Sequence, residues 1–232
     1  MRPPAASCPE PLGSVAPMPA DPETTRAYGS RDARRAELLD AAVRVMAVTG
    51  VAGASTRAIT AEAGLAHGAF HYCFGVKEEL LGALLRQEVD AVVAQLASAE
   101  DPAGLPLEDS VAAVLRAELD RVRREPDRQR VLVDLAATVQ RIPALADLPR
   151  WEHGRYVEET RRRFAAAGID GDRAERSAVL AVAGMTGIVG AWLAHRDAGA
   201  DANADASADA VAERAVVDLA RVLALLAGDG GR

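Results

Sequence analysis

The chain has 232 residues, half of them hydrophobic and 3% aromatic, and its formal net charge is −7. This length and composition favour a folded soluble protein and allow one large core or two modest ones. Ala-rich stretches that also contain Arg and Glu favour helices over strands, so we expect an all-α fold.

The negative charge argues against a nucleic-acid partner, because phosphate binding usually needs a basic surface. The acidic excess lies in the second part of the chain, however. Residues 31–81 contain six basic and six acidic side chains, whereas residues 82–232 contain 19 basic and 25 acidic ones. If residues 31–81 contact nucleic acid, they do so as a segment that is neutral overall, and we expect such binding to depend only modestly on salt.

The sequence predicts neither export nor a membrane span. The N-terminus has no apolar signal core, and no uninterrupted apolar run of about 18 residues occurs. The two cysteines, Cys8 and Cys73, have no spacing typical of a metal site or a disulfide framework. We expect a cytoplasmic protein without a membrane partner, a metal or a cofactor.

Proline marks the first boundary, because seven of the twelve prolines lie within the first 22 residues. This composition predicts a disordered tail over residues 1–29. From Arg31 onward apolar residues recur at helical spacing, and Gly50 is expected to end that helix. The apolar stripe consists of Leu38, Leu39, Ala42, Val43 and Met46.

Three further helices are predicted before residue 100. Ser55 or Thr56 can cap a short helix that continues through Ala63 and ends in a left-handed glycine, Gly64. A second short helix is predicted for residues 66–74. A longer one follows Gly75 and reaches about residue 98, with Glu78 and Glu79 complementing its N-terminal dipole.

Prolines and glycines divide the rest of the chain into helices predicted at about 107–124, 127–141, 150–167, 172–195 and 208–227. The last two are separated by a low-complexity segment, Gly199–Asp209, which we interpret as a linker. The predicted domains are a helix-turn-helix domain over residues 30–81, with a connector helix to about 98, and a helical bundle over residues 82–228.

The two short helices between Thr56 and Phe74 have the dimensions of a helix-turn-helix, whose second helix enters the DNA major groove. The segment from Ser55 to Leu81, STRAITAEAGLAHGAFHYCFGVKEELL, closely resembles the DNA-binding domain of the TetR family of regulators. The resemblance covers roughly residues 34–85. It implies a dimeric, all-helical transcriptional regulator rather than an enzyme.

The resemblance also implies which residues contact DNA. Thr56 and Arg57 are expected to meet the phosphate backbone, and Lys77 is expected to bind another phosphate. The second short helix is expected to face DNA through His67, Gly68, Ala69, His71 and Tyr72, with Phe74 packing inward. The family's common Ser residues before this helix and before the lysine are replaced by Ala66 and Val76, which weakens two helix caps. His71 replaces the usual tyrosine, so base preference does not transfer from relatives.

A ligand cavity and a dimer interface follow from the same resemblance, which predicts a repressor that releases a palindromic operator when a small molecule binds. The alternative is an activator or a constitutive DNA-binding dimer without a ligand. Gly184, Gly187 and Gly190 indicate close helix approach in the dimer interface, or else packing within the chain. The candidate ligand-binding residues are polar or aromatic side chains in apolar helical runs: Thr138, Arg141, Trp151, His153, Tyr156, Met185 and Trp192.

Four further patterns have simpler explanations that we favour. His67 and His71 stand four residues apart, but two ligands leave a zinc site incomplete, and His153 and His195 complete no metal-dependent active site. Cys73 is interpreted as a buried thiol rather than a redox sensor. The alternating acidic residues of the 199–209 segment lack the glycine and the final Glu of a calcium loop. The Arg161–Arg163 run is interpreted as a solvated helix face.

Overall fold

The computed structural model describes residues 31–98, 105–169, 171–198 and 202–228. The predicted tail over residues 1–29 lies outside these residues. Within them the chain is helical and contains no strand, which confirms the all-α prediction. The elements are α2 (Arg31–Gly53), α3 (Thr56–Glu62), α4 (Gly68–Cys73), α5 (Lys77–Ser98), α6 (Leu107–Arg124), α7 (Pro126–Val139), a 3-10 turn η1 (Pro143–Leu145), α8 (Leu148–Ala166), α9 (Gly171–Ala198) and α10 (Ala202–Gly228).

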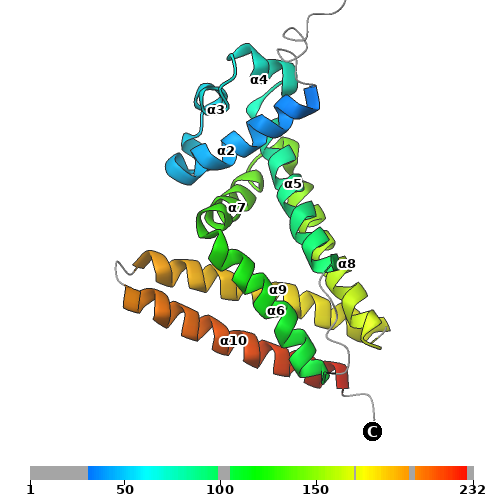
Figure 1. Ribbon diagram of the computed structural model, residues 1–232. Coiled ribbons are helices and arrows are strands. Elements are labelled where there is room, and N and C mark those ends of the chain that lie inside the picture. The colour runs from blue at the N-terminus through cyan, green and yellow to red at the C-terminus, as the bar shows by residue number, and fades with distance from the viewer. Residues whose placement is uncertain (1–30, 99–104, 170, 199–201, 229–232) are drawn as a thin grey trace, which may run out of the picture.

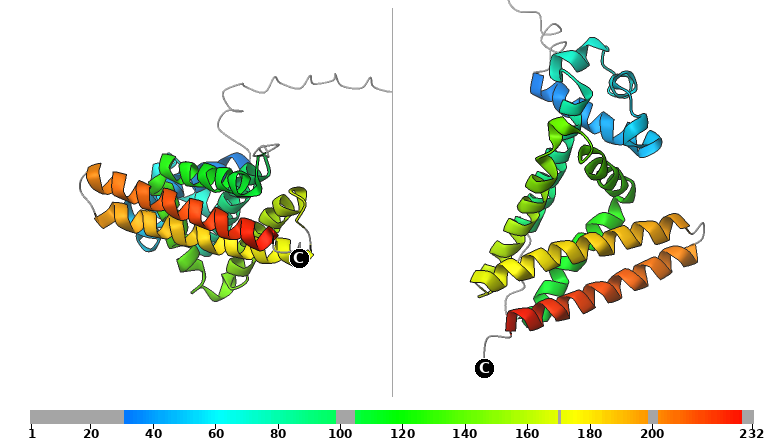
Figure 2. Two further views of the ribbon diagram at one scale, coloured as in Figure 1. Left: turned by 90° about the horizontal axis from the view of Figure 1, so that it is seen from below. Right: turned by 180° about the vertical axis from the view of Figure 1, so that it is seen from behind.

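The helices enclose a roughly triangular outline (Figure 1). The three N-terminal helices, α2 to α4, sit at its apex, and α5 runs down one side beside α8. The other side is formed by α7 and then α6, and the paired helices α9 and α10 form the base. The views from below and behind show the same pairing of α9 with α10 and of α6 with α10 (Figure 2).

The turns at the apex follow the local chemistry of the sequence. Gly50 interrupts α2 with a φ of 71°, in the left-handed region that favours glycine. The Ser55 hydroxyl oxygen accepts a hydrogen bond of 3.1 Å from the Ala58 amide and so caps α3. Gly64, with a φ of 67°, ends the following turn as predicted.

The two weakened caps have different outcomes. At the start of α4, His67 occupies the capping position without a side-chain hydrogen bond, and the helix begins at Gly68, two residues later than predicted. At the start of α5, the Glu79 carboxylate accepts a 2.9 Å hydrogen bond from the Gly75 amide. Glu79 therefore connects the first turn of α5 to Gly75, but it does not accept from a first-turn amide of the helix as the serine would.

The predicted linker is the clearest difference between sequence and structure, because α10 begins at Ala202 and the linker prediction is wrong for most of the 199–209 segment. Every second residue there is alanine, which has the highest helix propensity. The low-complexity composition of this segment therefore led to the prediction of a linker where a helix begins.

Two clusters of buried side chains hold the helices together. The first joins α2, α3, α4 and α5, and is completed by Val131, Leu135 and Val139 of α7 and Leu148 of α8. The second joins α6, α8, α9 and α10. Because α7 contributes to the first cluster, the N-terminal helices rest directly on a helix of the C-terminal bundle.

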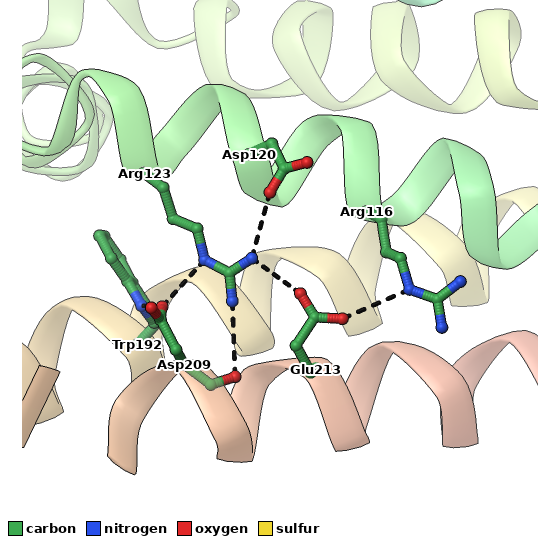
Figure 3. A network of polar contacts seen from close by, with 6 residues as sticks. All are labelled: Arg116, Asp120, Arg123, Trp192, Asp209 and Glu213. Atoms are coloured by element: carbon green, nitrogen blue, oxygen red, sulfur yellow. Dashed lines mark hydrogen bonds and ion pairs between the residues drawn. The ribbon is translucent and has the colours of Figure 1, made fainter. Parts of the chain in front are cut away.

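A polar network fixes α6 to the base of the triangle (Figure 3). Arg123 of α6 donates to Asp209 at 2.9 Å and to Glu213 at 2.7 Å, both on α10. The indole of Trp192 on α9 donates to the same Asp209 carboxylate at 2.8 Å. Arg116, two turns before Arg123 on α6, donates to Glu213 at 3.3 Å. These contacts fix the positions of α6, α9 and α10 relative to one another.

In the described part of the chain, α9 is long and apolar enough over Gly171–Arg196 to cross a membrane, judged by length and composition alone. Of the apolar window, 44% is buried inside the protein, where α9 packs against α8 and α10. A core helix of a helical bundle meets the same criteria.

Candidate functional site

The exposed face of α4 contains the side chains predicted to face DNA. His67, His71 and Tyr72 are exposed, as is Gly68, and Ala69 is half-buried. On the opposite face Phe70, Cys73 and Phe74 are at most 1% exposed, so the predicted inward packing of Phe74 is confirmed. The helix thus separates a solvent-facing surface from a face that anchors it to α2.

Two arginines of α2 hold the C-terminal end of α4. Arg35 donates to the Cys73 carbonyl at 3.1 Å, and Arg31 donates to the same oxygen at 3.4 Å. The Arg35 guanidinium also lies 4.2 Å from the centroid of the Phe74 ring. Cations at a helix C-terminus satisfy its free carbonyls and complement its dipole. This role could not be predicted from the sequence, because the contacts join residues more than 35 positions apart.

The phosphate-binding candidates are placed differently from one another. Arg57 is exposed on α3, with no ion-pair partner among the described residues, and Thr56 beside it is half-buried. The Lys77 ammonium donates instead to the carbonyl oxygens of Val51, at 3.0 Å, and Ala52, at 3.5 Å. Lys77 therefore joins the start of α5 to the end of α2.

The two histidines of this surface do not form a metal site with any third ligand. Their rings meet edge to face with centroids 5.6 Å apart, and no group of three candidate ligands occurs in the residues that the structure describes. His71 Nδ1 lies 3.3 Å from the Gly75 carbonyl oxygen, which is a hydrogen bond when Nδ1 carries the proton. In that tautomer Nε2 is an acceptor.

A contact not foreseen from the sequence joins the apex to the bundle. The Val51 amide, released from helical bonding by the kink at Gly50, donates to the Asp134 carboxylate of α7 at 2.9 Å. The carbonyl of the same residue accepts from Lys77. One peptide segment therefore connects α7, α2 and α5.

Below the apex lies a cavity of about 380 Å³ that reaches from α5 and α6 across α7 and α8 to α9. Of the seven predicted ligand-binding residues, Tyr156 and Met185 line it. Thr138, Arg141, Trp151, His153 and Trp192 do not. Arg141 and His153 are exposed, Trp151 lies against the Arg86 guanidinium at 5.6 Å, and Trp192 is engaged with Asp209.

The charged side chains that do line the cavity were missed: Glu88, Glu118, Arg121, Glu152 and Arg163. Arg121 binds Glu118 through two hydrogen bonds of 2.8 and 2.6 Å and donates to Gln129 at 2.8 Å. Burial raises the pKa of the Glu152 carboxyl above its usual value. Burial, together with the nearby carboxylates, also raises the pKa of the Tyr156 hydroxyl, which therefore stays neutral.

A helix-turn-helix with an exposed second helix, carried on a helical body with a cavity, defines the chain as a DNA-binding transcriptional regulator of the repressor type. Residues 38–84 match the model of a family described as bacterial regulatory proteins, tetR family. The chain is 31% identical over 142 residues to HdnoR, the HTH-type nicotine-responsive transcriptional repressor of Paenarthrobacter nicotinovorans, covering 58% of this chain and 69% of HdnoR. This chain belongs to the TetR family of transcriptional regulators.

Solved structures agree with the fold. A transcriptional regulator from Rhodococcus sp. Rha1 superposes with a TM-score of 0.64 at 23% identity, over 82% of this chain and 95% of that one. GusR of Salmonella enterica superposes with a TM-score of 0.62 at 23% identity, over 84% and 95% of the two chains. The whole described body, and not only the apex, therefore has the architecture of these regulators.

Proposed function

We propose that the protein is a ligand-responsive repressor that binds a palindromic operator as a homodimer and releases it when a small molecule enters the cavity. The observation that carries the ligand response is the cavity itself, since a constitutive DNA-binding dimer needs no hollow between its helices. The relative HdnoR is named a nicotine-responsive repressor, which supports the proposal that a small molecule controls DNA binding here. We propose that residues 30–81 form the DNA-binding domain and that residues 82–228 bind the ligand and form the dimer.

Hydrogen bonds between the helices that line the cavity and the end of α2 support a coupling of ligand binding to the DNA-binding surface. Helices α5 and α7 both line the cavity, and both are tied to Val51 at the end of α2. A ligand that shifts either helix changes the position of the apex, and with it the separation of two recognition helices in a dimer. Those helices need a spacing of about 34–36 Å, one turn of DNA, to fit two half-sites.

Substitutions of Arg57 and His71 are expected to separate backbone contact from base reading. Arg57→Ala should weaken binding to all sequences alike and lower the slope of log affinity against log salt by about 1. His71→Ala should instead relax discrimination at one base pair by about 1–3 kcal/mol. With Nδ1 bonded to Gly75, Nε2 accepts hydrogen bonds, as contact with the amino group of adenine or cytosine requires.

The measurement is selection from a random duplex library with each protein, followed by titration of the enriched sequence at several salt concentrations. Arg57 is preferred to Lys77 as the test, because Lys77 also connects α2 and α5. Equal effects of the two substitutions on specificity would contradict the assigned roles. Failure to enrich any palindrome with the unmodified chain would contradict operator binding itself.

The proposed dimer face lies on α9 and α10. The exposed positions of α9 from 179 to 194 follow one another at helical spacing and are uncharged: Val179, Ala183, Thr186, Gly187, Gly190, Ala191 and Ala194. The exposed side of α10 adds Val211, Val222 and Leu225. Gly184 has a neighbour within the chain, since a Cβ there would lie 2.7 Å from Leu219 Cδ2. Cβ atoms at Gly187 and Gly190 would meet nothing within 4 Å, so these two face open space.

Gly187→Arg is therefore expected to leave the protomer folded and to break the dimer. The new side chain has room in one chain but places a charge on an apolar face that a second copy covers. Gly154→Arg on α8 is the matched control, because Gly154 is also helical, exposed and open. Sedimentation velocity should show a dimer for the unmodified chain and for Gly154→Arg, and a monomer for Gly187→Arg. A dimeric Gly187→Arg protein would place the interface elsewhere.

A further inference from the structure

The cavity is lined mainly by aliphatic side chains, which suit a hydrophobic ligand body. They come from α5, α6, α7 and α9 and include Leu85, Val89, Val111, Leu115, Leu132 and Met185. Hydrophobic contact alone selects poorly among ligands, so the polar groups of the lining decide which chemistry the site accepts.

Most of the charges in the lining are already satisfied within the protein. Glu118 and Arg121 form a bidentate pair whose side chains are 14% and 16% exposed. Glu88, with a side chain 5% exposed, binds both Nε and Nη2 of Arg128. Arg163 donates to the Leu96 carbonyl oxygen. Glu88 and Glu118 are therefore already neutralised by arginines, so neither needs a cationic ligand to balance its charge.

Glu152 is different, because no hydrogen bond or ion pair joins its side chain to another described residue. Its pKa is raised by burial alone, with no neighbouring cation opposing the effect. Glu152 is half-buried in the cavity wall, and a carboxylate partly withdrawn from water without a partner is stabilised when an opposite charge approaches it. Burial without a partner is what a preformed binding group for a cation requires.

We propose that the cavity selects an amphipathic organic cation, such as a protonated amine with an apolar body, and that Glu152 is the counter-ion of its nitrogen. This inference rests on the proposed function, in which the cavity is the effector site. An anion is disfavoured, because the lining holds three glutamates against two arginines, and one of these arginines, Arg121, is already neutralised by Glu118.

Tyr156 supports the same ligand chemistry. It follows Glu152 by one helical turn on α8, and both line the cavity, so they present adjacent groups to one ligand. Its neutral ring offers a π face that attracts cations. A carboxylate and an aromatic ring on one face bind a cation by two mechanisms at once.

The test uses three probes of one shape and different charge: 4-phenylbutylamine, 4-phenylbutan-1-ol and 4-phenylbutanoate. Binding to the full-length chain is measured by isothermal titration calorimetry at neutral pH, with Glu152→Gln and Glu158→Gln variants alongside. Glu158 lies on the same helix, does not line the cavity, and pairs with Arg161 at the surface. It controls for a general effect of removing one charge from α8.

The amine is expected to bind the unmodified chain more tightly than the alcohol or the carboxylate. Glu152→Gln should weaken amine binding about tenfold or more, as for a desolvated charge pair, and change alcohol binding little. Glu158→Gln should leave all three affinities unchanged. Equal binding of the amine to the unmodified and Glu152→Gln proteins would overturn the assignment of Glu152.

Other outcomes separate this inference from the proposed function. Tighter binding of the alcohol or the carboxylate than of the amine overturns cation selection but leaves a ligand-binding regulator. Absence of binding by all three overturns the ligand response as well, because a cavity of about 380 Å³ has room for each. Release of an operator duplex by the amine, followed by fluorescence anisotropy, links binding to regulation.

The pH dependence of amine binding provides a second readout. The ionised form of Glu152 binds the cation, so affinity should fall as pH drops through the raised pKa of that carboxyl. The other ionisable side chains of the cavity lining are Tyr156, which stays neutral, the paired Glu118 and Arg121, Glu88, which is paired with Arg128, and Arg163, which donates to the Leu96 carbonyl oxygen. The dependence should disappear in Glu152→Gln, and its persistence there would assign it to another group.

Discussion

Phe70→Ala is expected to destabilise the folded chain by about 3–5 kcal/mol, the usual range for deleting a fully buried aromatic ring. Phe70 is 0% exposed, and its ring packs beside that of Phe74 with centroids 5.8 Å apart. The six residues of α4 are too few to form a stable helix alone, so the helix depends on this packing. Denaturant unfolding followed by circular dichroism measures the loss, and affinity for a selected operator should fall with it.

Tyr72→Ala is the matched control on the same short helix. Tyr72 is 59% exposed, so its removal should change stability by no more than about 0.5 kcal/mol. It should nevertheless weaken DNA binding, because this side chain belongs to the proposed DNA-facing surface. A large loss of stability in Tyr72→Ala, or none in Phe70→Ala, would contradict the orientation of α4 described above.

Arg128→Ala is expected to destabilise the protein by about 2–3 kcal/mol. The substitution leaves the Glu88 carboxylate, 5% exposed, without its cation inside the bundle. Breaking a fully buried pair costs about 3–5 kcal/mol, and the lower figure allows for the partial exposure of the arginine side chain. Urea unfolding at neutral pH provides the measurement.

A second variant combines Arg128→Ala with Glu88→Gln. It removes the unpaired charge of the Glu88 carboxylate and should therefore recover part of the lost stability. Arg44→Ala is the surface control: Arg44 and Glu62 are joined at 2.6 Å, but their side chains are 56% and 42% exposed. That substitution should cost less than about 1 kcal/mol. If the two single arginine variants were equally destabilised, burial would not govern the strength of these pairs.

The elements that the sequence predicted well are those controlled by local chemistry. Ser55 and Gly64 act through their own backbone and immediate neighbours, and the structure shows the cap and the left-handed glycine where they were expected. Gly50 was expected to end the first helix, but it kinks the helix instead, and α2 continues to Gly53. The start of α10 was missed because its alternating Ala and acidic residues read equally well as a polar linker. Only the packing of α10 against α9 and α6 decides between the two.

The cavity could not be located from the sequence, as two identical patterns show. Glu118 with Arg121 and Glu158 with Arg161 have the same three-residue spacing on amphipathic helices. The first pair lines the cavity with both side chains at most 16% exposed, whereas the second is 38% and 43% exposed at the surface. The orientation of each helix about its own axis causes this difference in exposure, and that orientation is set by contacts with helices that are distant in the sequence. Choosing aromatic residues instead selected Trp151 and Trp192, which have structural partners.

Lys77 is the one lysine in the sequence, and its ammonium occupies the joint between α2 and α5. The chain therefore has a single ε-amino group for isotope labelling by reductive methylation, which retains the positive charge. The resonance of that group would report directly on the joint through which the bundle meets the DNA-binding helices. Titrations with DNA and with candidate effectors could then follow the same atom in the otherwise unaltered protein.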